Sequence, residues 1–250
     1  MIPTPARPRR AGLLAASAAA ALGLWAVGAA AQTTDAPAPS VETGETAEAK
    51  AMPQPVEDIV MGQADAPVTV IEYASFTCSH CGDFATDSFP KLKAEYIDTG
   101  KVKYIQRDVY FDAVGLWAGV LAHCDPSKYY AIGEELLTTQ DKWLSGAKTG
   151  DQAAENLRKV GLAAGMTAEQ MDACWKDEAM VERLVSTYQV NASKDGIEGT
   201  PTFIINGEKV PNQPWDGLKA KIEEKLAAPA PAAPAAPAEP APAQPVPSGN

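Results

Sequence analysis

The sequence predicts an α/β domain that carries an inserted helical subdomain. A β-branched run at residues 67–74 is followed by a helical pattern and then by a second strand. Helical patterns fill about 113–196, and an Asn206-Gly207 dipeptide then separates two further strand-like runs. We therefore expect a βαβ unit and a hairpin in one sheet, with the helical subdomain inserted between them.

The first half of the domain has a strand, helix, strand pattern. Pro67–Ala74 is β-branched and apolar, as expected of a buried central strand. After the segment 75–81, apolar residues recur at helical spacing between Phe84 and Ala94. Lys101–Ile105 then follows Gly100 as a second strand, which completes a right-handed βαβ unit.

The helical insertion is expected to break at three places: Asp125-Pro126, 145–150 and 161–167. Thr167 and Gln170 form a capping-box pattern that predicts a helix start there. Glu178–Asp195 then predicts a longer helix that ends at Gly196.

The last part of the domain predicts a hairpin and a closing helix. Thr202–Ile205 and Glu208–Val210 flank Asn206-Gly207, a strong signal for antiparallel strands joined by a tight turn. Trp215–Leu226 follows with one apolar helical face. The predicted domain therefore covers 56–226.

Both flanks of this domain differ from it in composition. Residues 1–31 combine Arg7, Arg9 and Arg10 with an uncharged alanine-rich run, which indicates a signal peptide cleaved near Ala31. An uncleaved membrane anchor is the alternative, because the run approaches spanning length. Residues 32–55 are expected to be a disordered linker and the Ala/Pro-rich residues 227–250 a disordered tail, either an inert spacer or a partner-binding segment.

The charge of the chain argues against one class of partner. Removing the signal peptide takes away three of the 21 basic residues and none of the 32 acidic ones, which leaves about 14 net negative charges. An acidic balance of this size is unfavourable for nucleic acid, so none is expected as a partner. Export without a C-terminal retention tetrapeptide indicates the bacterial periplasm.

Four cysteines divide into two pairs by spacing. Cys78 and Cys81 form a CxxC motif at a strand-to-helix junction, whereas Cys124 and Cys174 lie in the helical region. At a helix N-terminus, unpaired N–H groups and the helix dipole stabilise a thiolate, so Cys78 is the expected nucleophile and Cys81 the resolving thiol. His80, between them, is expected to stabilise that thiolate further, which makes the pair an oxidant.

Two other uses of the CxxC motif are weighed against this one. Zinc would need a second ligand pair, and the chain offers only His80 and His123, so no metal is expected. A purely structural bridge is the other alternative, although so short a loop constrains little chain entropy. His80 could also be an ordinary surface histidine.

The sequence resembles the bacterial DsbA-type thiol-disulfide oxidoreductases of the thioredoxin superfamily. The resemblance lies in three segments: Ala66–Tyr73, Cys78-Ser79-His80-Cys81 and Gly199–Phe203. It implies a thioredoxin-like fold with an inserted helical subdomain. It also implies that Pro201 is a cis-proline opposite the cysteines, with Thr200 beside it presenting backbone groups to a substrate peptide. A trans-proline in an ordinary turn is the alternative.

The resemblance assigns roles to three further residues. Glu72 would be a buried acid that relays protons to Cys81, the alternative being a carboxylate on a wet face of the sheet. Cys124 and Cys174 would form a structural disulfide, with a redox-active pair as the alternative.

Trp117, Trp143 and Trp175 are expected to be core or groove aromatics.

The expected function is a periplasmic dithiol oxidase that introduces disulfide bonds into exported proteins and needs no cofactor. Its partners would be reduced cysteine-containing polypeptides and, as the family implies, a membrane quinone-linked thiol oxidase. Isomerases of this class are dimers with a folded N-terminal dimerisation domain, and residues 32–55 are too short and too polar to be such a domain. A monomer is therefore expected. A disulfide isomerase or reductase with the same centre is one alternative, and a non-catalytic periplasmic chaperone or peptide-binding module is the other.

Overall fold

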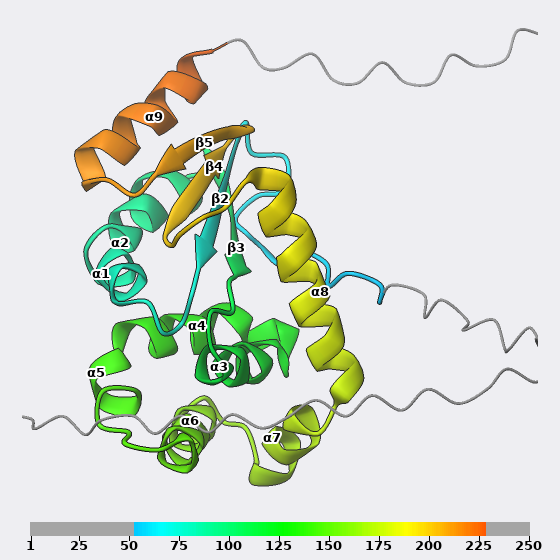
Figure 1. Ribbon diagram of the computed structural model, residues 1–250. Coiled ribbons are helices and arrows are strands. Elements are labelled where there is room, and N and C mark those ends of the chain that lie inside the picture. Colours follow the sequence, from blue (N-terminus) through cyan, green and yellow to red (C-terminus); the bar gives the residue numbers. More distant parts are fainter. Residues whose placement is uncertain (1–52, 229–250) are drawn as a thin grey trace, which may run out of the picture. The chain divides into compact units, whose positions relative to one another are not determined.

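The computed structural model describes residues 53–228, which form a five-stranded mixed sheet with helices around it (Figure 1). The strands are β1 (Val60–Met61), β2 (Val68–Ala74), β3 (Val102–Asp108), β4 (Thr202–Ile205) and β5 (Glu208–Pro211). They lie in the order β1-β3-β2-β4-β5. Only β2 and β3 are parallel; the other neighbours are antiparallel. The β-branched run 68–74 is thus the central strand, as predicted.

The helices follow the predicted order along the chain. Those between β2 and β3 are α1 (Ser79–Asp87), α2 (Phe89–Leu92) and the π-helical turn η1 (Lys93–Ile97). Those between β3 and β4 are α3 (Ala113–His123), the 3-10 turn η2 (Pro126–Lys128), α4 (Tyr129–Thr138), α5 (Gln140–Trp143), α6 (Gly150–Ala163), α7 (Ala168–Trp175) and α8 (Glu178–Asp195). After β5 comes α9 (Trp215–Ala227). This is a thioredoxin-like fold with a helical insertion, as predicted.

The predicted flanking segments fall almost wholly outside this description. The signal peptide (1–31), nearly all of the linker (32–55) and the tail beyond residue 228 lie outside the described residues. Within residues 53–228, no helix is long and apolar enough to cross a membrane.

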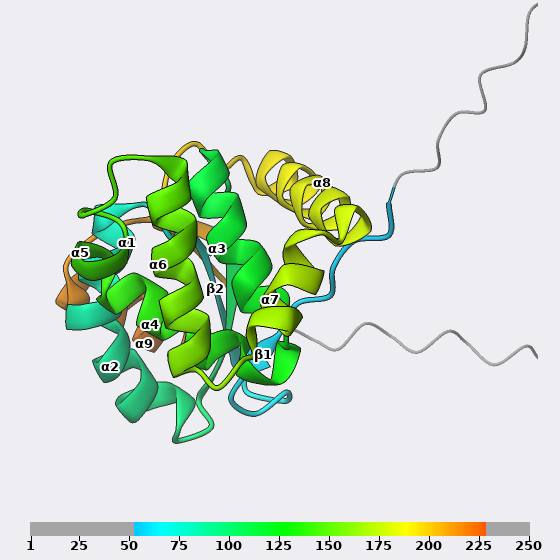
Figure 2. The same ribbon diagram turned by 90° about the horizontal axis from the view of Figure 1, so that it is seen from below.

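The two faces of the sheet carry different helices (Figures 1 and 2). Because side chains alternate along a strand, Val68 and Val70 of β2 share one face, where they pack with residues of α1, α2 and α9. Ile71 and Tyr73 lie on the other face, which α8 covers. Glu72 has the parity of Val70, so its side chain lies on the face of α1 and α2.

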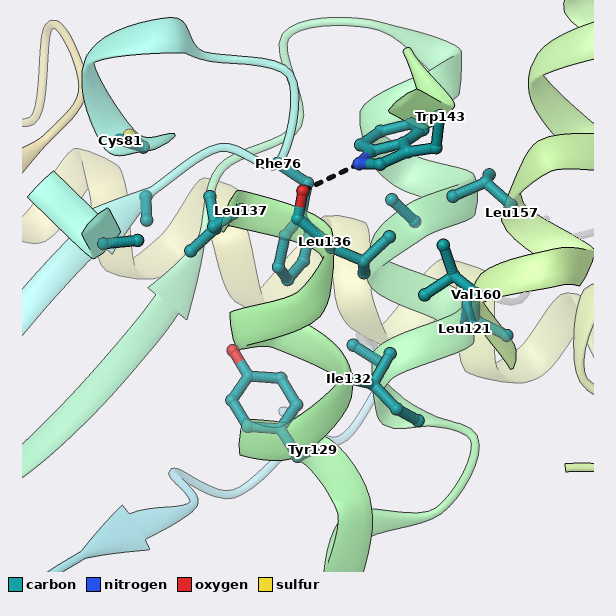
Figure 3. Packing of buried hydrophobic residues seen from close by; sticks show 14 of the residues in the cluster. Phe76, Cys81, Leu121, Tyr129, Ile132, Leu136, Leu137, Trp143, Leu157 and Val160 are labelled. Atoms are coloured by element: carbon teal, nitrogen blue, oxygen red, sulfur yellow. Dashed lines mark hydrogen bonds between the residues drawn. The ribbon is translucent and has the colours of Figure 1, made fainter. Parts of the chain in front are cut away.

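A second core lies among the inserted helices (Figure 3). Its largest member is Trp143, which is 2% exposed and donates from its indole N–H to the carbonyl oxygen of Leu136 at 2.7 Å. Trp175 packs partly buried against this core, whereas Trp117 is 37% exposed. The expectation of core or groove positions therefore holds best for Trp143.

Two local predictions are confirmed in detail. Thr167 and Gln170 form the reciprocal bonds of a capping box at the start of α7. Asn206 (φ 46°) and Gly207 (φ 84°) make the left-handed turn between β4 and β5. The Asn206 side chain also accepts a hydrogen bond from the Thr69 backbone N–H at 2.8 Å, which ties the hairpin to the central strand.

The predicted helix break at 161–167 spans only 164–167 in the structure, because α6 continues through Gly161 to Ala163. A Cβ at position 161 would lie 2.3 Å from the Met171 sulfur. The glycine therefore serves close packing of α7 on α6. The predicted strand 101–105 also extends further, to Asp108, because β3 pairs with the full length of β2.

Cys124 and Cys174 form a disulfide in the structure, with their Cα atoms 5.7 Å apart. The bond joins the C-terminal end of α3 to α7. It closes a loop of 50 positions and lies apart from the free thiols Cys78 and Cys81.

Candidate active site

Cys78 is the N-cap residue of α1, directly after the central strand. β2 ends at Ala74, and a short turn places Cys78 by a hydrogen bond from its backbone N–H to the carbonyl oxygen of Ser75 at 3.1 Å. Cys78 is half-buried and Cys81, one turn into the helix, is fully buried. The first cysteine is therefore open to a reaction partner and the second is shielded.

The surroundings of Cys78 favour its thiolate. Its pKa falls from 9.0 to about 5, mainly because the Cys81 thiol donates a hydrogen bond to it, and despite partial burial, which acts in the opposite direction. Thr200 and the backbone N–H groups of Cys81 and His80 lower this pKa further. Both N–H groups lie in the first turn of α1, where the helix dipole favours a negative charge. At neutral pH the reduced centre thus holds its negative charge on Cys78.

The structure places the His80 imidazole next to Asp83. It is 72% exposed on its side chain and pairs with Asp83 of the same helix, Nδ1 to Oδ2 at 3.4 Å. What His80 gives to the Cys78 sulfur is its backbone N–H. The hydrogen bond that His80 makes to Cys78 therefore comes from the peptide backbone, and any residue other than proline would provide it. The contribution of the imidazole stays a prediction.

Thr200 and Pro201 lie directly before β4, opposite the cysteine pair. The peptide bond between them is cis. Since Thr202 of β4 pairs with Tyr73 of β2, the preceding residues lie beside the segment that follows β2. The Cys78 thiol donates to the Thr200 carbonyl oxygen at 3.4 Å. The Thr200 hydroxyl is buried without a conventional partner among the described residues, and a thiolate at Cys78 would be an acceptor for it.

Glu72 is 1% exposed, so it does not lie on a wet face of the sheet. The Tyr104 hydroxyl donates to its Oε2, while Oε1 has no partner among the described residues. Burial, and to a lesser degree the charge of Cys78, raises the pKa of Glu72 to about 8, against the lowering effect of Tyr104. Hydrogen bonding to Cys78, burial and the charge of Glu72 raise the pKa of Cys81. Glu72 and Cys81 therefore both favour their protonated forms at neutral pH.

One residue of the site had no signal in the sequence. Gln140, at the start of α5, donates from Nε2 to the carbonyl oxygens of Phe76 at 2.8 Å and Cys78 at 3.0 Å. Gly82 of α1 leaves room for it, because a Cβ there would lie 2.8 Å from Gln140 Oε1. Gln140, which belongs to the helical insertion, thus fixes the backbone of the turn between Phe76 and Cys78. Only the tertiary structure brings these segments together.

Within residues 53–228, no cluster of His, Cys, Asp and Glu has the composition of a metal site. The two histidines lie in different surroundings: His80 pairs with Asp83, and His123 Nε2 lies 3.1 Å from Asp108 Oδ2. The residues described offer no second ligand pair for zinc beside Cys78 and Cys81.

A cysteine pair at the start of a helix, opposite a cis-proline on a mixed sheet, defines a protein of the thioredoxin class. A family model described as thioredoxin matches residues 54–224. Disulfide bond formation protein D of Bacillus subtilis is 29% identical over 177 residues, with 67% of this chain and 76% of that protein covered. The chain belongs to the thioredoxin superfamily and, within it, to the DsbA-type thiol-disulfide oxidoreductases.

Further relatives agree with this assignment. The crystal structure of α-DsbA1 from Wolbachia pipientis has a TM-score of 0.63 at 28% identity and covers 70% of this chain and 94% of that one. A Rickettsia bellii relative, named as a candidate protein-disulfide oxidoreductase, is 31% identical over 171 residues, which is 68% of this chain. The match spans 64% of that relative, slightly under two thirds of its length.

Proposed function

We propose that this protein is an exported dithiol oxidase that introduces disulfide bonds into cysteine-containing polypeptides. The observation that carries the proposal is the pKa of Cys78, lowered to about 5 beside a buried Cys81 thiol. A stabilised thiolate favours the reduced form of the pair, and a disulfide whose reduced form is stable is a strong oxidant.

The proposed cycle uses residues of this chain alone. A substrate thiolate attacks the Sγ of Cys78 in the Cys78–Cys81 disulfide, and Cys81 leaves and takes up a proton. A second substrate thiolate then attacks the substrate sulfur of the mixed disulfide, and Cys78 leaves as a thiolate. Cys78 is the better leaving group because its pKa is lowered, whereas burial and its neighbours raise that of Cys81.

Glu72 is proposed as the proton donor and acceptor of Cys81. Its pKa of about 8 keeps it largely protonated at pH 7, so it can supply the proton that the departing Cys81 thiolate needs. Thr200 and Pro201 are proposed to bind the substrate backbone, because they lie opposite Cys78 without a continuous strand partner.

The setting of the reaction is part of the proposal. The signal-like residues 1–31 and the resemblance to exported oxidoreductases support the periplasm, with reduced exported polypeptides as substrates. Reoxidation by a membrane quinone-linked thiol oxidase would complete the cycle, with the protein acting as a monomer.

A redox titration of the mature protein against glutathione tests the direction of the reaction. We expect a potential well above that of thioredoxin, which is about −270 mV. A value near that of thioredoxin would make the protein a reductase and overturn the proposal. In parallel, Cys78→Ala should lose all oxidation of a reduced client protein. Retention of client binding with no oxidation by the unmodified protein would instead indicate a chaperone, and efficient reshuffling of a scrambled client would indicate an isomerase.

A further inference from the structure

A small cavity lies beside Glu72, on the face of the sheet that α1, α2 and α4 cover. Its polar lining residues are Glu72, Tyr104, Gln106, Tyr130 and Glu134. The rest of the wall is apolar and consists of Phe84, Ala85, Phe89 and Leu137. The buried acid of the redox centre thus borders a space whose remaining lining residues are apolar.

The cavity has room for water. It leaves about 20 Å³ for the centres of water molecules, and one water needs roughly 10–15 Å³. A buried water also needs polar partners. Glu72 Oε1 offers such a site, because it is buried and has no hydrogen-bond partner among the described residues.

Most of the polar lining groups are already engaged with other atoms. The Tyr104 hydroxyl donates to Glu72 Oε2, the Tyr130 hydroxyl donates to the carbonyl oxygen of Ile59 at 2.5 Å, and Gln106 donates to Asp108 at 3.0 Å. Glu134 differs from them: it lines the same cavity, it is ionisable, and it is exposed on the surface of α4. Among the lining residues, it is therefore the side chain that is both ionisable and exposed to solvent.

We propose that Glu134 carries protons between solvent and Glu72 through water in this cavity. The proposal rests on the proposed function and extends its proton step. It places part of the redox chemistry on the helical insertion, since α4 belongs to that insertion and Glu72 to the sheet.

The proton balance of the cycle requires such a path. When substrate attack breaks the Cys78–Cys81 bond, Cys81 leaves with the electron pair and takes the proton of Glu72. The resulting Glu72 carboxylate is buried, which is unfavourable, so it must regain a proton from outside. Glu134 supplies it through the cavity water and is itself reprotonated by solvent. When the pair is reoxidised, the Cys81 proton leaves along the same path in reverse.

The test is Glu134→Gln in the mature, oxidised protein, with the single-turnover oxidation of a reduced cysteine peptide followed from pH 5 to pH 9. In dilute buffer at pH 7 we expect the rate to fall about tenfold, less than the roughly 100-fold or more of an acid that acts directly. A high concentration of imidazole buffer should restore much of the rate, because a small diffusible acid can replace the relay. Glu134→Asp should also restore it.

Glu135→Gln is the matched control. Glu135 is the next residue of α4, is exposed, and does not line the cavity, so it makes the same charge change without touching the path. We expect its rate, and the glutathione equilibrium constant of both variants, to match those of the unmodified protein. A merely structural role of Glu134 would lower the unfolding midpoint and show no rescue by buffer.

The outcomes separate this inference from the proposed function. If the unmodified protein oxidises the peptide and Glu134→Gln does so equally fast at every buffer concentration, the relay is wrong and the oxidase proposal stands. The same holds if Glu135→Gln slows the reaction as much as Glu134→Gln does. If the unmodified protein fails to oxidise the peptide, the proposed function itself is wrong.

Discussion

The hydrogen bond from the Cys81 thiol should account for a large share of the reactivity of Cys78. It is the main cause of the lowered pKa of Cys78, ahead of Thr200 and the backbone N–H groups. Cys81→Ala removes this donor and leaves the other groups in place. The variant therefore isolates one side chain from the helix terminus on which both cysteines lie.

The expected size of the effect follows from the type of bond. A hydrogen bond to a charged group contributes about 1.5–3 kcal/mol, and one pKa unit corresponds to about 1.4 kcal/mol. We therefore expect the pKa of Cys78 to rise by about one to two units in Cys81→Ala, since the sulfur is only half-buried and water replaces part of the lost bond. Cys81→Ser keeps a donor at the same position and should stay close to the starting value.

The assay is the absorbance of the thiolate at 240 nm between pH 3 and pH 9, with the alkylation rate of Cys78 as an independent measure. The unmodified reduced protein should titrate near pH 5. If Cys81→Ala titrates at the same pH as Cys81→Ser, the thiol bond contributes nothing measurable. Thr200, the backbone N–H groups and the helix dipole would then carry the whole shift.

Three further predictions concern stability. In the reduced protein Glu72 has a folded pKa of about 8 against an ordinary 4.5, so it destabilises the fold increasingly as pH rises from 4.5 to 8. Over the unmodified reduced protein, Glu72→Gln should therefore gain unfolding free energy by about 1.4 kcal/mol per pH unit across this range. A difference in urea denaturation that does not depend on pH would contradict it. Replacing both Cys124 and Cys174 by alanine removes their disulfide and opens a 50-position loop, so the unfolding free energy should fall by about 4 kcal/mol. Oxidation of a client protein should continue. Loss of turnover in the folded variant would indicate a redox role for this disulfide. Trp143→Phe removes the hydrogen bond to the Leu136 carbonyl and leaves a gap in the helical core. Thermal unfolding should therefore show a loss of about 2 kcal/mol in unfolding free energy. An unchanged midpoint would exclude this contribution of the indole ring to stability.

Much of the fold was accessible from the sequence because its signals are local. The β-branched run at 68–74, the capping box at Thr167 and the Asn206-Gly207 turn all depend on residues next to one another in the chain, and the structure has each of them. The two-residue strand β1 had no such signal, because it depends on pairing with β3. The place of Gly161 inside α6 had no local signal either, because this glycine allows close packing against Met171 of another helix.

The features of the candidate site also fall into two groups: those that follow from adjacent residues and those that depend on how side chains lie in the folded protein. The CxxC motif and its place at a helix start follow from adjacent residues, so the sequence already predicts Cys78 as the nucleophile. The sequence could not separate an imidazole contribution at His80 from a backbone one. That difference depends on the rotamer, and the side chain turns toward Asp83.

The sequence by itself thus determined the order of the elements and the place of the Cys78–Cys81 pair at the start of a helix, because periodicity and spacing are carried along the chain. The tertiary structure decided what surrounds them: the contact of Thr200 with Cys78, the burial of Glu72, and the approach of Gln140 and Glu134 from the insertion. A pKa depends on distances and on exclusion of water, and both arise only when segments far apart in the chain pack together.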